Sequence, residues 1–208
     1  MTSRQHLPIF PLPDLVLFPH TLLPLHIFEP RYRAMTADCL ARDRRLAIVG
    51  LKPGYEPDYH GRPPVHEVAG VGRIVQCERL ASGRFNMILR GEGRVRIARE
   101  LPTDTLYRLV EAEEMPEVGA DRESVPPMVE LVRKTGRHIL HAVKRSTPEM
   151  EAALAEDAAP GVLCDQIASA LVPAPDARQA LLEEADVEHR LRRLLAELSA
   201  LLKQLKDG

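Results

Sequence analysis

Histidine next to glutamate is the first combination in this sequence that could do chemistry. His66-Glu67 begins like the H-E-x-x-H motif of zinc peptidases, in which two histidines one helical turn apart bind the metal. Gly70 stands where the second histidine would be, so the motif is incomplete. His138 and His141 lie three residues apart on a predicted helix and could share a metal ion. No further ligands stand at an obvious spacing, so we favour a surface or capping role and expect no metal site.

The other catalytic patterns are also missing. No serine lies in a G-x-S-x-G elbow, and no G-x-x-x-x-G-K-[ST] phosphate loop occurs. GVGRIV (70–75) and GEGRVR (91–96) begin like dinucleotide fingerprints but lack the third glycine, so we interpret their glycines as strand ends and bulges. These gaps predict a protein that is not an enzyme and needs no cofactor.

The composition is that of a soluble globular protein, with 208 residues, 45% hydrophobic and 28% charged. A net charge of −2 gives no general attraction to nucleic acid or to an anionic membrane. A basic stripe is still conceivable along one predicted strand, but Glu92 and Glu100 interrupt it and aromatic residues for base stacking are scarce. The arginines in question are Arg90, Arg94, Arg96 and Arg99.

The three cysteines, Cys39, Cys77 and Cys164, are far apart and odd in number. They argue against a disulfide framework and predict a cytoplasmic protein with buried thiols.

The opening stretch, LPIFPLPDLVLFPHTLLPLHIFEPRY from Leu7, combines a long apolar run with many prolines. Each proline inside a helix costs about 3 kcal/mol, so the five between Pro8 and Pro24 exclude a membrane helix. We predict two short strands, Leu7 to Leu12 and Leu22 to Phe28, joined by an ordered apolar loop. In the second strand Leu23, Leu25 and Ile27 share one face.

The remaining pattern predicts an α+β chain in two parts. A helix from Pro30 to about Ala41 and a strand over 44–51 come first, followed by a hairpin around Ala81-Ser82-Gly83 and a strand that begins near Leu106. Residues 1–117 are therefore predicted as a β domain. Residues 118–208 are predicted as a helical bundle, which includes a helix over Thr147 to Glu156.

Leucines in the last predicted helix are spaced four, three, four, which is the a/d pattern of a coiled coil. Packing within the chain's own bundle is the favoured interpretation, and self-association as a homodimer is the alternative. The residues concerned are Leu194, Leu198, Leu201 and Leu205.

Two long stretches, the opening one and GVGRIVQCERLASGRFNMILRGEGRVRI, resemble the N-terminal substrate-binding domain of the Lon (La) ATP-dependent proteases. The tail from Cys164, with its LLE..DV..RL stretch, resembles the helical half of the same domain. The resemblance implies a PUA-like pseudo-β-barrel followed by a C-terminal α-helical bundle. Lon proteases continue with an ATPase module and a Ser-Lys protease module, and the chain ends at Gly208. We therefore expect a stand-alone, non-catalytic Lon-domain protein.

The family resemblance and the apolar loop together suggest what such a protein binds. Proline at both ends of the loop would hold it in place, and its apolar residues are consecutive, so we expect part of it to be exposed. Our hypothesis is that unfolded or partly folded polypeptide, or a protease or chaperone partner, contacts the loop, as in protein quality control. The residues are Leu15, Val16, Phe18 and Leu22.

Two alternatives stay open. The loop residues could cap the open end of the barrel, and the barrel could instead be an RNA-binding module of PUA-like fold. Glu29 and Arg31, within FEPRY, are predicted to hold the fold as an ion pair or a helix start.

Overall fold

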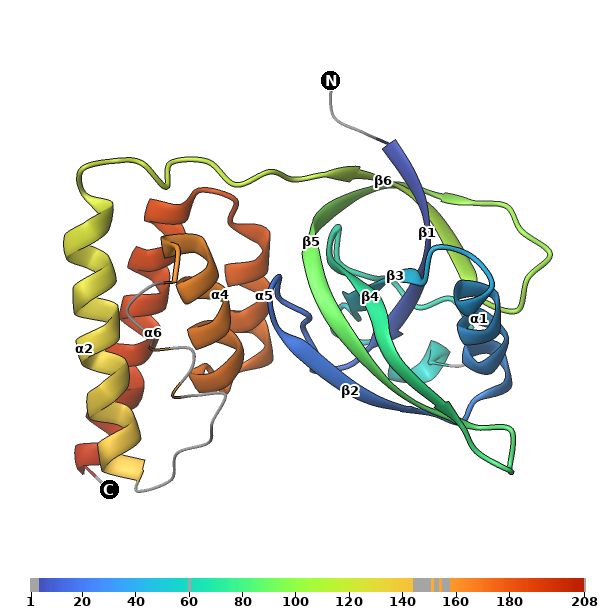
Figure 1. The fold of residues 1–208 in the computed structure, drawn as a ribbon, viewed down its shortest axis with the longest axis horizontal. Helices are drawn as coiled ribbons and strands as arrows, with labels where there is room; N and C mark the ends of the chain where they lie inside the picture. Colours follow the sequence, from blue (N-terminus) through green and yellow to red (C-terminus); the bar gives the residue numbers. More distant parts are fainter. Residues whose placement is uncertain (1–3, 60, 144–150, 152–153, 155–157, 208) are drawn as a thin grey trace. The chain divides into compact units, whose positions relative to one another are not determined.

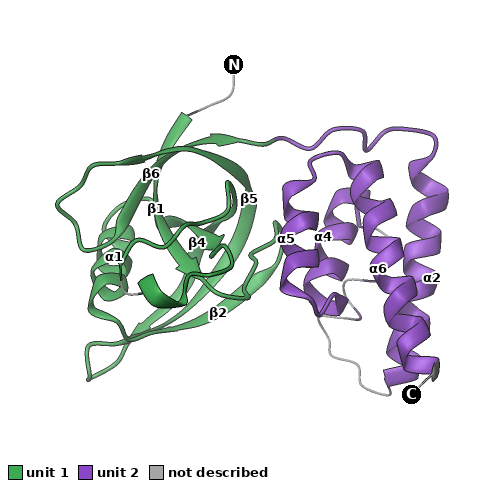
Figure 2. Ribbon diagram, turned by 180° about the vertical axis from the view of Figure 1, so that it is seen from behind, with its two compact units in different colours: residues 1–115 green, residues 116–208 purple. Residues whose placement is uncertain are grey.

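The computed structural model describes the chain except residues 1–3, 60, 144–150, 152–153, 155–157 and 208. The chain divides into two compact units, residues 1–115 and residues 116–208, which Figure 2 shows in different colours. The sequence pattern puts this division after residue 117.

Unit 1 carries the β-strands of the described chain and one helix. The strands are β1 (Arg4–Leu12), β2 (Leu22–Ile27), β3 (Arg45–Gly50), β4 (Val68–Arg79), β5 (Phe85–Leu101) and β6 (Arg108–Glu114), and the helix is α1 (Pro30–Leu40) (Figure 1). A single 3-10 turn, η1 (Glu56–Asp58), lies between β3 and β4.

The strands of unit 1 pair in a closed circuit. Following the pairs from β5 through β4, β3, β1 and β6 leads back to β5. The β1–β3 pair is parallel and the other pairs are antiparallel. Strand β2 stands outside this circuit and pairs with the first half of β5, from Leu22 opposite Arg90 to Ile27 opposite Phe85.

Alternation along the chain explains these strands. In β5 the side chains of Phe85, Met87 and Leu89 are buried and their neighbours are more exposed, as a strand with one face on the core requires. Gly83 has a φ of 76° in the β4–β5 connection, which confirms the predicted hairpin. β5 does not end at Gly91 and Gly93 but runs through both, and its register with β4 shifts between them, as the predicted bulge requires.

A loop of residues 13–21, which we call the crossing loop, lies across strands β4 and β5. A methyl group at Gly70 would collide with the carbonyl oxygen of Leu17, and one at Gly91 would collide with that of Phe18. Only glycine permits so close an approach of two backbones. The backbone N–H of His20 donates to the carbonyl of Gly91 at 3.0 Å, which fixes the end of the loop.

Unit 2 is helical. It contains α2 (Val125–Val143), α4 (Pro160–Leu171), α5 (Pro175–Glu183) and α6 (Val187–Asp207) (Figure 1). Helices α2 and α6 lie side by side, with Val132 and Ile139 of α2 and Leu191 of α6 fully buried. The helix predicted over Thr147 to Glu156 falls mostly outside the described residues.

Candidate functional site

The crossing loop buries some of its apolar side chains and leaves others partly exposed. Phe18 is 0% exposed and Leu17 is 1% exposed, while Leu15 and Val16 are half-buried. The prediction that Phe18 contacts a partner is therefore wrong. Its neighbour Leu17 belongs to the core of unit 1, and the backbone of the loop lies against Gly70 and Gly91.

Leu22, the last of the four predicted contact residues, is 61% exposed at the start of β2. The face of β2 that carries it continues through Pro24 and His26 to Phe28, which is 57% exposed just beyond the strand. The rings of His26 and Phe28 stack with centroids 6.3 Å apart. We call Leu22, Pro24, His26 and Phe28 the β2 outer row.

The opposite face of β2 is the one that holds the strand in place. Leu23, Leu25 and Ile27 pack on the core of unit 1, as the sequence alternation predicts. The outer row has one polar tie to its neighbour strand, in which His26 Nδ1 lies 2.7 Å from Asn86 Oδ1. A strand anchored by three apolar residues thus presents a row of apolar and aromatic side chains to solvent, which is typical of an interaction site.

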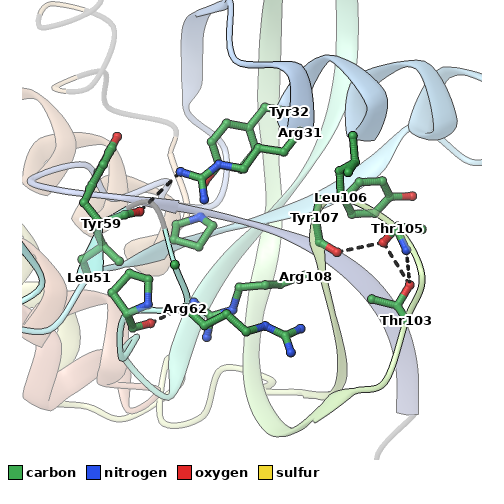
Figure 3. Close-up of a pocket in the computed structure, with 13 residues that line it drawn as sticks. Arg31, Tyr32, Leu51, Tyr59, Arg62, Thr103, Thr105, Leu106, Tyr107 and Arg108 are labelled. Atoms are coloured by element: carbon green, nitrogen blue, oxygen red, sulfur yellow. Dashed lines mark hydrogen bonds between the residues drawn. The ribbon is translucent and has the colours of Figure 1, made fainter. Parts of the chain in front are cut away.

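Unit 1 also contains a cavity of about 240 Å³, shown in Figure 3 and called here the arginine–tyrosine pocket. The Arg31 guanidinium lies 4.7 Å from the Tyr32 ring centroid and 6.0 Å from that of Tyr59. Its Nε donates to Glu29 Oε2 at 3.0 Å, so the predicted ion pair forms. Glu29 is also the residue before the first turn of α1, which confirms its place at a helix start.

The other arginines of the pocket also have carboxylate partners. Arg108 pairs with Glu100 and donates through Nη1 to the carbonyl of Pro63 at 2.9 Å. Arg62 Nη2 lies 3.7 Å from the same Glu100. Because every guanidinium of this pocket is next to a carboxylate, the pocket is not an open anion site.

Two tyrosines of the pocket, Tyr32 and Tyr107, are weaker acids than a free tyrosine. Burial raises the pKa of Tyr32 to about 12. Burial, together with the hydrogen bond from the Tyr107 hydroxyl to Asp38 Oδ2 at 2.7 Å, also raises the pKa of Tyr107 to about 12. The hydroxyls of Thr103 and Thr105 lie 2.9 Å from each other. The described lining residues are thus joined by hydrogen bonds and ion pairs, and none of these contacts pairs a nucleophile with a base.

Leu106 lines this pocket, and its position there was not predicted from the sequence. The sequence pattern predicts that a strand begins near Leu106. Instead Leu106 lies before β6 and is 68% exposed. Pro102 and Asp104, with Thr103 and Thr105 beside Asp104, are the local signal that the strand begins later.

The arginines of β5 do not make a basic stripe. Arg94 is 3% exposed, Arg96 pairs with Glu67 at 3.6 Å, and Arg99 pairs with Glu111 at 3.1 Å. Arg90 is exposed opposite Leu22. The interpretation as arginines that edge a sheet fits these contacts better than a nucleic-acid surface.

The leucine pattern of α6 is mostly internal. Leu194 and Leu198 are 0% exposed within unit 2, so they are not available for self-association. Leu201 is half-buried and Leu205 is 39% exposed. The exposed part of the pattern is thus limited to the last turns of the helix.

Two further searches cover the described part of the chain. No helix there is both long enough and apolar enough to cross a membrane. Nor do three or more histidine, cysteine, aspartate or glutamate side chains come together there in a way that could hold a metal ion.

Comparison with known proteins gives a consistent family. The family described as ATP-dependent protease La (LON) substrate-binding domain matches residues 6–200. Lon protease 4 of Sorangium cellulosum is 31% identical over 99% of this chain and 26% of its own length. Lon protease 2 of the same organism is 29% identical over 98% of this chain and 26% of its own length. The chain thus spans about a quarter of the length of these curated relatives.

Two solved structures have the same fold. The N-terminal domain of the Mycobacterium avium complex Lon protease superimposes with a TM-score of 0.70 at 22% identity, over 94% of this chain and 98% of that one. A Lon N-terminal domain protein from Xanthomonas campestris gives 0.67 at 22% identity, over 92% and 98%. At this identity the likeness shows the fold alone, which is mixed α+β.

Proposed function

Because the chain belongs to the ATP-dependent protease La (LON) substrate-binding domain family, we propose that it binds polypeptide, through the β2 outer row. The observation that carries this proposal is the exposure of Leu22 (61%) and Phe28 (57%) on one face of a strand whose other face is anchored in the core. An unfolded chain exposes apolar side chains, which are stabilised when they leave water against another apolar surface. The polar surface of a folded protein gains little from such a contact. The partner is therefore an unfolded or partly folded polypeptide.

The wider setting belongs to the same proposal. The role is non-catalytic recognition in cytoplasmic protein quality control, in which the bound polypeptide passes to a protease or chaperone. The described cysteines form no disulfide, which suits a reducing compartment. The closed pairing circuit of unit 1 supports the PUA-like barrel that the sequence resemblance implies.

Fluorescence anisotropy of a labelled, permanently unfolded protein, titrated with this chain, tests the proposal. We expect saturable binding that weakens at least about tenfold, or about 1.4 kcal/mol, in Leu22→Asp and in Phe28→Asp. Leu106→Asp is the matched variant, because Leu106 is 68% exposed in the same unit but on another surface.

Three results would count against the proposal. Absence of binding by the unaltered chain removes the function. Loss of binding in Leu106→Asp but not in Leu22→Asp moves the site to the arginine–tyrosine pocket. A labelled RNA run alongside at two salt concentrations tests the RNA-binding alternative, and salt-dependent RNA binding without polypeptide binding would replace the proposal.

A further inference from the structure

Strand β2 leaves one of its two backbone edges without a partner strand in the described chain. Its register partners all belong to β5. The N–H of Gly91 in β5 donates to the carbonyl of Thr21 at 2.9 Å, just ahead of β2. Since backbone groups alternate between the two edges of a strand, Leu23, Leu25 and Ile27 also direct theirs toward β5.

The backbone N–H and C=O groups of Leu22, Pro24 and His26 consequently point to the free edge, except that Pro24 has no N–H. Pro24 agrees with this assignment, because proline has no N–H and is tolerated in a sheet only where its nitrogen faces away from the ladder. The free edge therefore offers carbonyls at Leu22, Pro24 and His26 but N–H donors only at Leu22 and His26.

The same three residues also carry exposed side chains. Leu22, Pro24 and His26 belong to the β2 outer row, so a molecule at this edge meets backbone donors, backbone acceptors and an apolar face together. Another extended backbone presents donors and acceptors at the matching spacing, whereas a helix has already used its own.

We infer that polypeptide binds by adding as a strand to the free edge of β2, with its alternate apolar side chains beside the β2 outer row. This inference rests on the proposed function and specifies the substrate class: an extended segment with apolar residues at every second position. Helical or folded ligands are excluded. Strand β2 has six residues, so a segment of about that length can pair.

Pro24 gives this inference a test by gain of binding. Pro24→Val keeps an apolar side chain and adds the missing N–H at the centre of the free edge. One additional net hydrogen bond is worth between about twofold and about tenfold in affinity, and we expect Pro24→Val to bind the labelled unfolded protein more tightly by that factor. A pocket or side-chain contact alone would gain nothing from the new donor.

His26 supplies the converse test with a matched pair of variants. His26→Pro and His26→Val both remove the imidazole and its contact with Asn86, but only His26→Pro removes the outward N–H. We expect His26→Pro to bind about twofold to tenfold more weakly than His26→Val. If His26→Pro does not fold, Pro24→Val still decides the question.

The outcomes separate the two levels of the proposal. Unchanged affinity in Pro24→Val, with clear binding by the unaltered chain, overturns strand addition and leaves polypeptide binding by side chains. No binding by the unaltered chain overturns both. Tighter binding in Pro24→Val together with weaker binding in His26→Pro than in His26→Val establishes strand addition.

Discussion

Arg190 Nε lies 3.4 Å from Asp165 Oδ1, and both side chains are buried inside unit 2. The same guanidinium pairs with Glu117 and donates through Nη1 to the carbonyl of Glu184 at 2.9 Å. Burial alone would lower the pKa of Arg190, but its negative neighbours, led by Asp165, outweigh burial and raise it. One cation thus ties α6 to α4, to the chain before α2 and to the α5–α6 connection.

Replacing Arg190 should destabilise unit 2 strongly. Arg190→Met removes the guanidinium that pairs with the buried Asp165, and breaking such a buried pair costs about 3–5 kcal/mol. Urea unfolding followed by helical circular dichroism measures the loss. Arg192→Met is the matched control on the same helix, because Arg192 is 63% exposed and its pairing with Glu188 is worth at most about 0.5 kcal/mol. Equal losses in the two variants would contradict the role given to Arg190.

Alanine substitutions at Gly91 and Gly93 of β5 should differ in their effect on stability, because the crossing loop lies against Gly91 only. Gly91→Ala brings a methyl group onto the carbonyl of Phe18, and overpacking of this kind costs about 1–3 kcal/mol. Nothing lies within 4 Å of a methyl group at Gly93, so Gly93→Ala should change stability by less than about 0.5 kcal/mol. Urea midpoints of the two variants decide the point. A Gly91→Ala protein as stable as Gly93→Ala would mean that the loop does not lie on the strand.

Low pH should destabilise unit 2 through the protonation of two carboxylates, Asp186 and Glu188. Hydrogen bonds from Arg122 hold the pKa of Asp186 below its ordinary 3.8 and that of Glu188 below its ordinary 4.5. A pKa lowered in the folded state gives stability that is present above the ordinary pKa and lost as the pH falls through the folded one. The free energy of unfolding should therefore fall as the pH drops below about 4.5.

Arg122→Gln should flatten this acid dependence, since the carboxylates then lose their shared donor. Urea titrations at a series of pH values from about 5 to about 3 provide the measurement. Arg193→Gln serves as the control, because Arg193 donates to the carbonyl of Ala180. The explanation fails if Arg122→Gln keeps the slope of the unaltered chain.

Thiol reactivity should distinguish the cysteines. Burial raises the pKa of Cys39 to about 12, and Cys164 is 0% exposed, so neither should react quickly with a thiol reagent at about pH 8. Cys77 is half-buried and should react first, although burial raises its pKa as well. In Cys77→Ser the early phase should disappear. An early phase that persists in this variant would place an accessible thiol elsewhere.

The sequence predicts local structure well where one periodicity governs it. Alternation placed Leu23, Leu25 and Ile27 on the core side of β2, and heptad spacing identified α6. The direction of Phe18 could not be predicted in the same way. The backbone of the loop lies against Gly70 and Gly91, which belong to other strands and become its neighbours only in the folded chain.

The candidate site was predicted in part for the same reason. Leu22 follows from its position in an apolar strand, but the contribution of Phe28 depends on the face that β5 leaves uncovered. The arginine–tyrosine pocket collects residues from five separate stretches of sequence, so no local motif predicts it. The pairing of Arg108 with Glu100 likewise depends on the pairing of β5 with β6, whereas the pair of Glu29 and Arg31 is local and was predicted.

Pro24 has a consequence for the behaviour of the protein at high concentration. A strand edge that accepts passing chains also accepts other copies of itself, and uninterrupted edges of this kind lead to aggregation. By removing one donor from the middle of the edge, Pro24 weakens continuous pairing between copies while the donors at Leu22 and His26 stay in place. Under the proposed strand addition, the proline thus sets a compromise between binding of other chains and solubility of this protein.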